Sequence, residues 1–146
     1  MATVFDVAKY ILDKTGTISA MKLQKLVYYA QAWALVWDDA PLFTDSKIEA
    51  WANGPVVRNL YEVHRGQFTV LAKDLANLAA GTLESFQKDT IDEVIKAYGN
   101  RSAQWLSDQT HAEAPWQLAR EGLSEMDRGE KEITLASMAE YYSSLQ

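Results

Sequence analysis

The sequence predicts a mainly α fold, a compact single-domain bundle of six to eight helices around a long central helix, with at most a small two-stranded β element near residues 42–51. Three observations predict it. A length of 146 residues suits one hydrophobic core. Apolar residues make up 48% of the chain while it holds only seven Gly and three Pro, which is typical of a packed globular protein. Along most of the chain the apolar residues recur at the three-four spacing of helices.

The first part of the chain predicts two amphipathic helices. Thr3 can cap a helix that runs to Lys14, because an apolar stripe follows it. Ser19 can cap a second helix that continues to Trp37 and carries apolar residues on several sides. The second helix is therefore expected at the centre of the fold, and Pro41 prevents its continuation.

The β element is expected from Leu42-Phe43 and residues 48–51, which flank a polar turn. Asn53-Gly54 then suits a turn, and Pro55 suits the first position of a third helix that Gly66 ends. The free amides at such a helix start could hold an anion, but turn formation accounts for the same residues.

Shorter helices are expected in the second half. Their ranges are 71–78, 89–98, 102–110, a turn or short helix from Pro115, and a last helix capped by Thr134 that follows a charged loop over 121–132. We find no repeat and no linker, so residues 1–146 are expected to form one domain.

Charge and composition exclude several classes of function. The net charge is −6, and residues 74–146 hold thirteen acidic and six basic side chains. This charge disfavours binding to nucleic acid and favours a basic partner. Alternatively, the negative charge serves only to keep the protein soluble. The chain has no Cys, and we expect neither a signal peptide nor a membrane span, because its first residues lack a positive charge followed by an apolar run and no apolar run is long enough to cross a membrane. We expect a cytoplasmic protein.

Residues with catalytic or ligating chemistry are few. His64 and His111 lack the spacing of paired metal ligands, so neither a metal nor a cofactor is expected. His64 lies on an apolar helix face and is expected in the core. His111 stands near Glu113, and an imidazole beside a carboxylate could act in a small enzyme. No recognisable nucleophile accompanies this pair, and a structural role accounts for His111 equally well. The first two helices could also be mistaken for a helix-turn-helix, yet they carry no basic patch.

Two segments carry a resemblance to a known family. They read Met21-Lys22-Leu23-Gln24-Lys25-Leu26-Val27-Tyr28-Tyr29-Ala30-Gln31-Ala32-Trp33 and Ala50-Trp51-Ala52-Asn53-Gly54-Pro55-Val56-Val57. Together with the later His111 and Pro115-Trp116, they resemble the Panacea antitoxin domain, the SocA-like and GepA-like group of small bacterial and prophage proteins. The similarity covers nearly the whole chain in order and is loose only over residues 68–87. The motif positions are Lys22, Leu23, Gln24, Lys25, Tyr28, Tyr29, Trp51, Gly54, Pro55, Val56, His111, Pro115 and Trp116.

The resemblance implies a compact helical antitoxin of a toxin-antitoxin system, without catalysis of its own. It would neutralise a protein toxin, encoded by an adjacent gene, through direct binding. An adaptor that delivers the partner to a protease is the alternative, followed by a DNA-binding regulator and an enzyme using His111 and Glu113. The sequence does not decide whether the protein forms a homo-oligomer.

Candidate partner contacts lie in or beside the two segments. They are Lys25, Tyr28, Trp37, Trp51, Arg58 and Tyr61. For each aromatic residue a place in the core competes with this role, because one domain must bury most of its aromatic side chains. Lys25 and Arg58 are expected to be exposed, either as contacts or as solvated charges. The acidic residues between Glu121 and Glu132 could steer a basic toxin.

Overall fold

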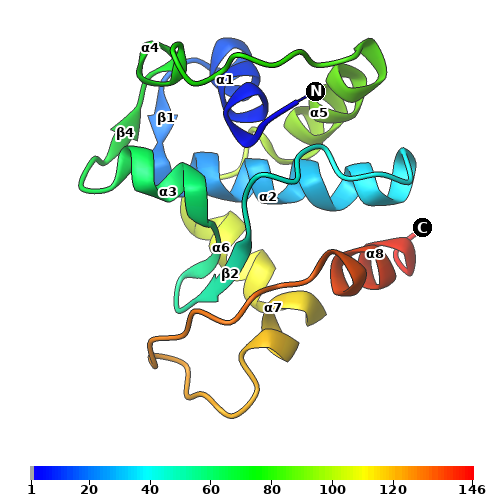
Figure 1. The fold of residues 1–146 in the computed structure, drawn as a ribbon. Helices are drawn as coiled ribbons and strands as arrows, with labels where there is room; N and C mark the ends of the chain where they lie inside the picture. Colours follow the sequence, from blue (N-terminus) through cyan, green and yellow to red (C-terminus); the bar gives the residue numbers. More distant parts are fainter. Residues whose placement is uncertain (1) are drawn as a thin grey trace.

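A computed structural model describes residues 2–146, which form eight helices and two small antiparallel sheets (Figure 1). The mainly α fold predicted from the sequence is confirmed. The elements in chain order are α1 (Val4–Thr15), β1 (Ile18–Ser19), α2 (Ala20–Trp37), β2 (Ile48–Trp51), β3 (Gly54–Val57), α3 (Arg58–His64), β4 (Thr69–Val70), α4 (Ala72–Leu75), α5 (Ser85–Tyr98), α6 (Ala103–His111), α7 (Ala114–Ala119) and α8 (Leu135–Ser143).

The two predicted N-terminal helices are confirmed together with their caps. The Thr3 side chain accepts a hydrogen bond from the amide of Asp6, and the Asp6 carboxylate accepts one from the amide of Thr3, which completes a capping box on α1. The Ser19 hydroxyl accepts a hydrogen bond from the amide of Lys22 at 3.1 Å and caps α2.

Helix α2 runs through the middle of the molecule (Figure 1). It contacts α1 and α5 on one side, and α6, α8 and β3 on the other. Every residue from Leu23 to Ala32 is buried as a result. The predicted central position is therefore confirmed, and it has one consequence that the periodicity did not indicate: polar residues of this stretch are buried as well.

The β element differs from the prediction. Leu42-Phe43 is not a strand, because Gln31 on α2 holds the backbone of both residues through its side-chain amide. Strand β2 pairs instead with β3, from Ile48 opposite Val57 to Trp51 opposite Gly54. The predicted helix start at Pro55 was wrong, since the tight turn brings the chain back along β2 for four residues before α3 begins at Arg58.

A second sheet was not predicted. It joins Ile18 to Val70 and Ser19 to Thr69. Its strands have two residues each, which is too short to show an alternating pattern in the sequence.

In the C-terminal half, the predicted helices are present with shifted bounds. Helix α5 begins at Ser85, four residues before the predicted start, and α4 covers only Ala72–Leu75. Ser102 and Thr134 cap α6 and α8 as expected. The loop over 121–132 is also present, and its end runs beside β2, where the amide of Ala50 donates to the carbonyl of Lys131 at 2.9 Å.

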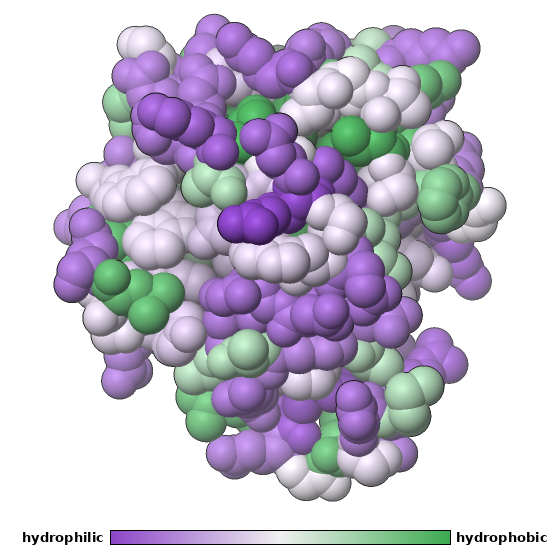
Figure 2. Space-filling model, turned by 180° about the vertical axis from the view of Figure 1, so that it is seen from behind, coloured by the Kyte–Doolittle hydropathy of each residue, from purple (hydrophilic) through white to green (hydrophobic). Residues whose placement is uncertain are grey.

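The face seen from behind has a mixed surface. Hydrophobic residues lie there in small groups between hydrophilic ones (Figure 2). This face of residues 2–146 thus offers no broad apolar patch of the kind that marks many protein interfaces.

Candidate functional site

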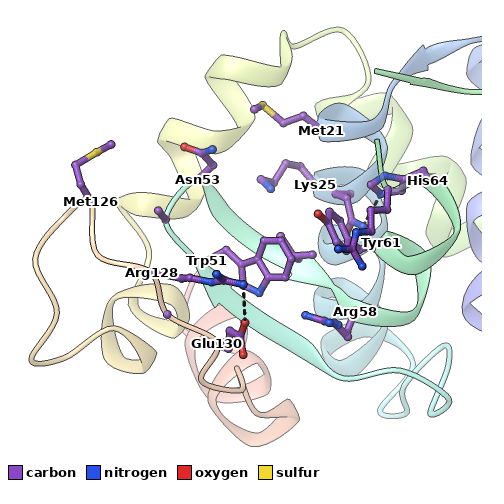
Figure 3. Close-up of a pocket in the computed structure, with 15 residues that line it drawn as sticks. Met21, Lys25, Trp51, Asn53, Arg58, Tyr61, His64, Met126, Arg128 and Glu130 are labelled. Atoms are coloured by element: carbon purple, nitrogen blue, oxygen red, sulfur yellow. Dashed lines mark hydrogen bonds and ion pairs between the residues drawn. The ribbon is translucent and has the colours of Figure 1, made fainter. Parts of the chain in front are cut away.

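A pocket of about 550 Å³ lies where the start of α2 meets the β2–β3 hairpin, α3 and the loop before α8 (Figure 3). Both segments that carried the family resemblance therefore contribute to one cavity. Its lining residues are Met21, Gln24, Lys25, Trp51, Ala52, Asn53, Val56, Arg58, Tyr61, His64, Arg65, Met126, Arg128, Gly129 and Glu130.

Lys25 is the most unusual residue of the pocket. Its side chain is 2% exposed, and its ammonium Nζ donates a hydrogen bond to the carbonyl of Pro55 at 2.9 Å. Among residues 2–146 no carboxylate lies within 4.0 Å of Nζ. Because burial penalises the charged form, it lowers the pKa of Lys25 to about 7. The pocket thus contains a buried amine that titrates near neutral pH.

Gly54 makes this position of Lys25 possible. Its φ of +121° lies in a region that other residues rarely adopt. A Cβ atom on residue 54 would stand 2.7 Å from Cε of Lys25, which is closer than real Cβ contacts allow. The Gly-Pro pair therefore fixes the hairpin directly against the lysine: Gly54 leaves room for it and Pro55 supplies the acceptor.

Gln24 fastens the same hairpin to α2. Its Oε1 accepts from the amide of Val57 at 2.6 Å, and its Nε2 lies 3.3 Å from the Val57 carbonyl and 2.9 Å from Nε2 of His64. If Gln24 donates to that ring nitrogen, His64 is the neutral acceptor, in agreement with a pKa that burial lowers. His64 is buried, so its predicted place in the core is confirmed.

Trp51 forms one wall of the pocket and is held in place on three sides (Figure 3). Its indole N–H donates to Glu49 at 2.8 Å, and its ring meets Tyr61 edge-on with centroids 4.7 Å apart. Arg58 lies over the same ring at 5.7 Å and forms ion pairs with Glu62 at 3.0 Å and Glu49 at 3.6 Å. Contacts within the fold therefore fix this wall in place.

The opposite wall comes from the loop between α7 and α8. Met126, Arg128 and Glu130 line the pocket from this loop (Figure 3). Arg120 holds the loop, since its buried guanidinium donates to the carbonyl of Ala50 at 3.0 Å and to that of Asp127 at 2.5 Å. The loop is thereby tied to the hairpin that forms the other wall.

Four of the six residues proposed as partner contacts meet in this pocket: Lys25, Trp51, Arg58 and Tyr61. The expected exposure of Lys25 was wrong, because β3 packs against α2 and buries Lys25, which lines the pocket. Arg58 is exposed as expected, at 37% of its side chain. The four residues come from three elements, α2, β2 and α3, so the sequence alone could not predict that they lie close together.

The other two proposed contacts lie elsewhere. Tyr28 is 1% exposed, and its hydroxyl donates to that of Tyr142 of α8 at 3.0 Å, because the Tyr142 proton goes to Glu113; Tyr28 therefore cannot serve as a surface contact. Trp37 is 44% exposed at the far end of α2 and stacks on Trp33. The competing prediction, a place in the core, is thus correct for Tyr28.

Several motif positions serve the core rather than the pocket. Tyr29 and Tyr142 both donate to Oε1 of Glu113, at 2.8 and 2.7 Å, and burial raises the pKa of this carboxyl. Leu23 is fully buried, and Lys22 donates to the carbonyl of Gly99 at 2.7 Å. This buried acid was not predicted; of its two tyrosine partners, Tyr29 is a motif position and Tyr142 lies in α8, outside the motif.

His111 and Glu113 form neither a hydrogen bond nor an ion pair with each other within residues 2–146. The His111 ring stacks on Trp116 with centroids 4.1 Å apart, and its buried Nε2 has no hydrogen-bond partner within residues 2–146. Glu113 instead faces the tyrosines of the core. Pro115 occupies the first turn of α7 as predicted.

Two further findings concern residues 2–146 as a whole. Nowhere in this part of the chain do three or more His, Asp or Glu side chains gather in a way that could hold a metal ion. None of its helices combines the length and apolar character that a membrane crossing requires.

The fold and the pocket define a small, mainly helical protein with a pre-formed pocket. The family model described as antitoxin SocA-like, Panacea domain matches residues 23–117, which is more than half of the chain and covers both pocket-forming segments except Met21 and Lys22. The chain belongs to this family. No curated protein and no solved structure matches it.

Proposed function

We propose that this protein is an antitoxin that neutralises a protein toxin, encoded by an adjacent gene, by binding it directly in the cytoplasm. The observation that carries the proposal is that the family match spans residues 23–117, and that the matched residues form most of one pocket. Membership of the family implies a protein partner in general. Occlusion of a toxin requires a stable surface and no bond to be made or broken.

The pocket has the composition of an interaction hot spot. Stable protein interfaces bury roughly 800 Å² on each partner and depend on a few aromatic or arginine anchors within a polar rim. Trp51, Tyr61 and Arg58 are such anchors, and each is already held by neighbours within the fold. Little side-chain entropy is lost when a pre-ordered wall binds, which favours tight association.

Co-expression with the product of the adjacent gene tests the proposal. We expect that product to arrest growth when expressed alone, and the present protein to restore growth and to co-purify with it. If the product is harmless alone, or if growth is restored without a complex, direct neutralisation is wrong.

A pair of tryptophan variants tests the site. Trp51→Ala removes a wall of the pocket, whereas Trp37→Ala removes an exposed tryptophan at the far end of α2. We expect Trp51→Ala to weaken the complex at least tenfold and Trp37→Ala to bind as the wild type, measured by calorimetry on folded variants. The reverse order would place the interface around Trp37.

The same strains separate occlusion from delivery to a protease. Occlusion predicts that toxin accumulates in the complex, whereas an adaptor would lower the toxin level when the present protein is expressed. Immunoblots of toxin over time, after synthesis is stopped, distinguish the two mechanisms.

A further inference from the structure

The charge of Lys25 is not balanced within the fold. An ammonium group has three donors, and the one hydrogen bond of Nζ within residues 2–146 goes to the neutral carbonyl of Pro55. Burial of a cation without a counter-ion is costly, and an apolar residue of similar size would fill this position without that cost. Figure 3 shows the Lys25 side chain directed into the pocket. The pocket is therefore where a counter-ion could reach it.

The other charges of the lining favour an anion from outside. Four cationic side chains line the pocket against one carboxylate, Glu130, in a protein whose net charge is −6. Arg58 is already paired with Glu49 and Glu62, and Arg128 lies 3.5 Å from Glu130. Lys25 and Arg65 form no ion pair within residues 2–146.

The apolar part of the lining limits the kind of anion. Met21, Trp51 and Val56 line the same pocket as the ammonium group and supply apolar surface to it. One buried charge matches a singly charged group, and a carboxylate carried on an apolar segment would satisfy the ammonium and the apolar walls together. A phosphate chain carries several negative charges, and those not paired with Lys25 would lie unpaired against the apolar walls.

We propose that the pocket binds a carboxylate, supplied by an acidic side chain in an apolar segment of the partner protein, with Nζ of Lys25 as its counter-ion. The source of the carboxylate rests on the proposed function, whereas the site itself does not. A partner segment thus inserts an acid between the hairpin and the 126–130 loop, and the carboxylate takes up the free donors of Lys25.

The site is tested first on the protein alone, with benzoate as the probe and benzamide as its neutral counterpart of the same shape. Binding is followed by NMR through the indole N–H signal of Trp51, assigned by its loss in Trp51→Phe. We expect saturable shifts with benzoate and at least tenfold weaker binding of benzamide. Equal binding of both probes, or binding of neither, would overturn the site.

Two lysine variants then locate the charge. Lys25→Met removes the ammonium, and Lys22→Met is its matched control, because Lys22 also lies on α2 and also donates to a backbone carbonyl, yet does not line the pocket. We expect benzoate affinity to fall at least tenfold in Lys25→Met and to be unchanged in Lys22→Met. Circular dichroism checks that both variants are folded. If a variant fails to fold, the comparison of benzoate with benzamide on the wild type still tests the site.

The source of the carboxylate is tested on the complex with the adjacent gene's product. We expect Lys25→Met to weaken this complex at least tenfold and benzoate to compete with the partner. If benzoate binds but the complex is indifferent to Lys25→Met, the pocket serves a free anion and the partner assignment is wrong. If the wild type forms no complex while benzoate binds, the proposed function fails, the partner assignment fails with it, and the anion site stands.

Discussion

Replacement of Lys25 by methionine should change the pH dependence of stability in a defined way. In the unfolded chain the lysine titrates near pH 10.5, whereas in the fold burial lowers its pKa to about 7. Between these values the unfolded state binds one proton more than the native state, so the free energy of unfolding rises with pH. The full penalty for the buried charge is about 5 kcal/mol, fully present below pH 7 and relieved towards pH 10.5.

The magnitude follows from this shift. From about pH 7 to about pH 9.5, the wild type should gain about 3 kcal/mol in free energy of unfolding, and Lys25→Met should stay flat. The variant leaves the carbonyl of Pro55 without its donor, at a cost of about 1–3 kcal/mol, so it should still be more stable at pH 7 by about 2 kcal/mol.

Urea unfolding followed by tryptophan fluorescence measures both curves. The range ends at about pH 9.5 because ordinary tyrosines ionise near pH 10, while burial raises the pKa of Tyr29 and Tyr142. The charge of Lys25 acts on two titratable groups, His64 and His111. Burial lowers the pKa of each histidine, so both stay neutral between about pH 7 and about pH 9.5. Lys22→Met should keep the wild-type slope. Parallel curves for the wild type and Lys25→Met would refute the reasoning.

Three further substitutions test the packing around the site. Gly54→Ala should lower the free energy of unfolding by about 2 kcal/mol or more, seen as a lower urea midpoint, because it strains a positive φ and places Cβ against Lys25. Gln24→Ala should cost about 2–4 kcal/mol and speed amide hydrogen exchange at Val57, since that amide loses its acceptor; an unchanged exchange rate would contradict the clamp. Glu113→Ala should cost about 2–4 kcal/mol in thermal unfolding, as two buried tyrosine hydroxyls lose their shared acceptor, and a loss below about 0.5 kcal/mol would argue against the network.

The sequence was a good guide to the helices and a poor guide to the hairpin. Helical spacing and capping residues are local signals, so α1 and α2 could be placed with their N-caps at Thr3 and Ser19. Pro55 is favourable both at a helix start and in a short edge strand, and only the pairing of β2 with β3 decides between them. The two-residue strands around Ile18 and Val70 carry no local signal at all.

The candidate site was predictable in its residue types and not in its geometry. Trp51, Arg58 and Tyr61 were proposed as anchors because such side chains dominate interfaces, and the fold brings all three to one pocket. The same reasoning chose Tyr28, which packs in the core instead. Residue type cannot distinguish these cases, since aromatic side chains are favourable in both places.

By itself, the sequence determined a single family, a mainly α fold and a central α2 whose apolar residues lie on several sides. Only the tertiary structure decided that Gln24 and Lys25 point inward. A helix exposes its polar residues unless another segment covers them, and here β3 covers them and supplies backbone groups as partners. Which face of a helix is covered depends on contacts between residues about thirty positions apart, and no local pattern encodes such contacts.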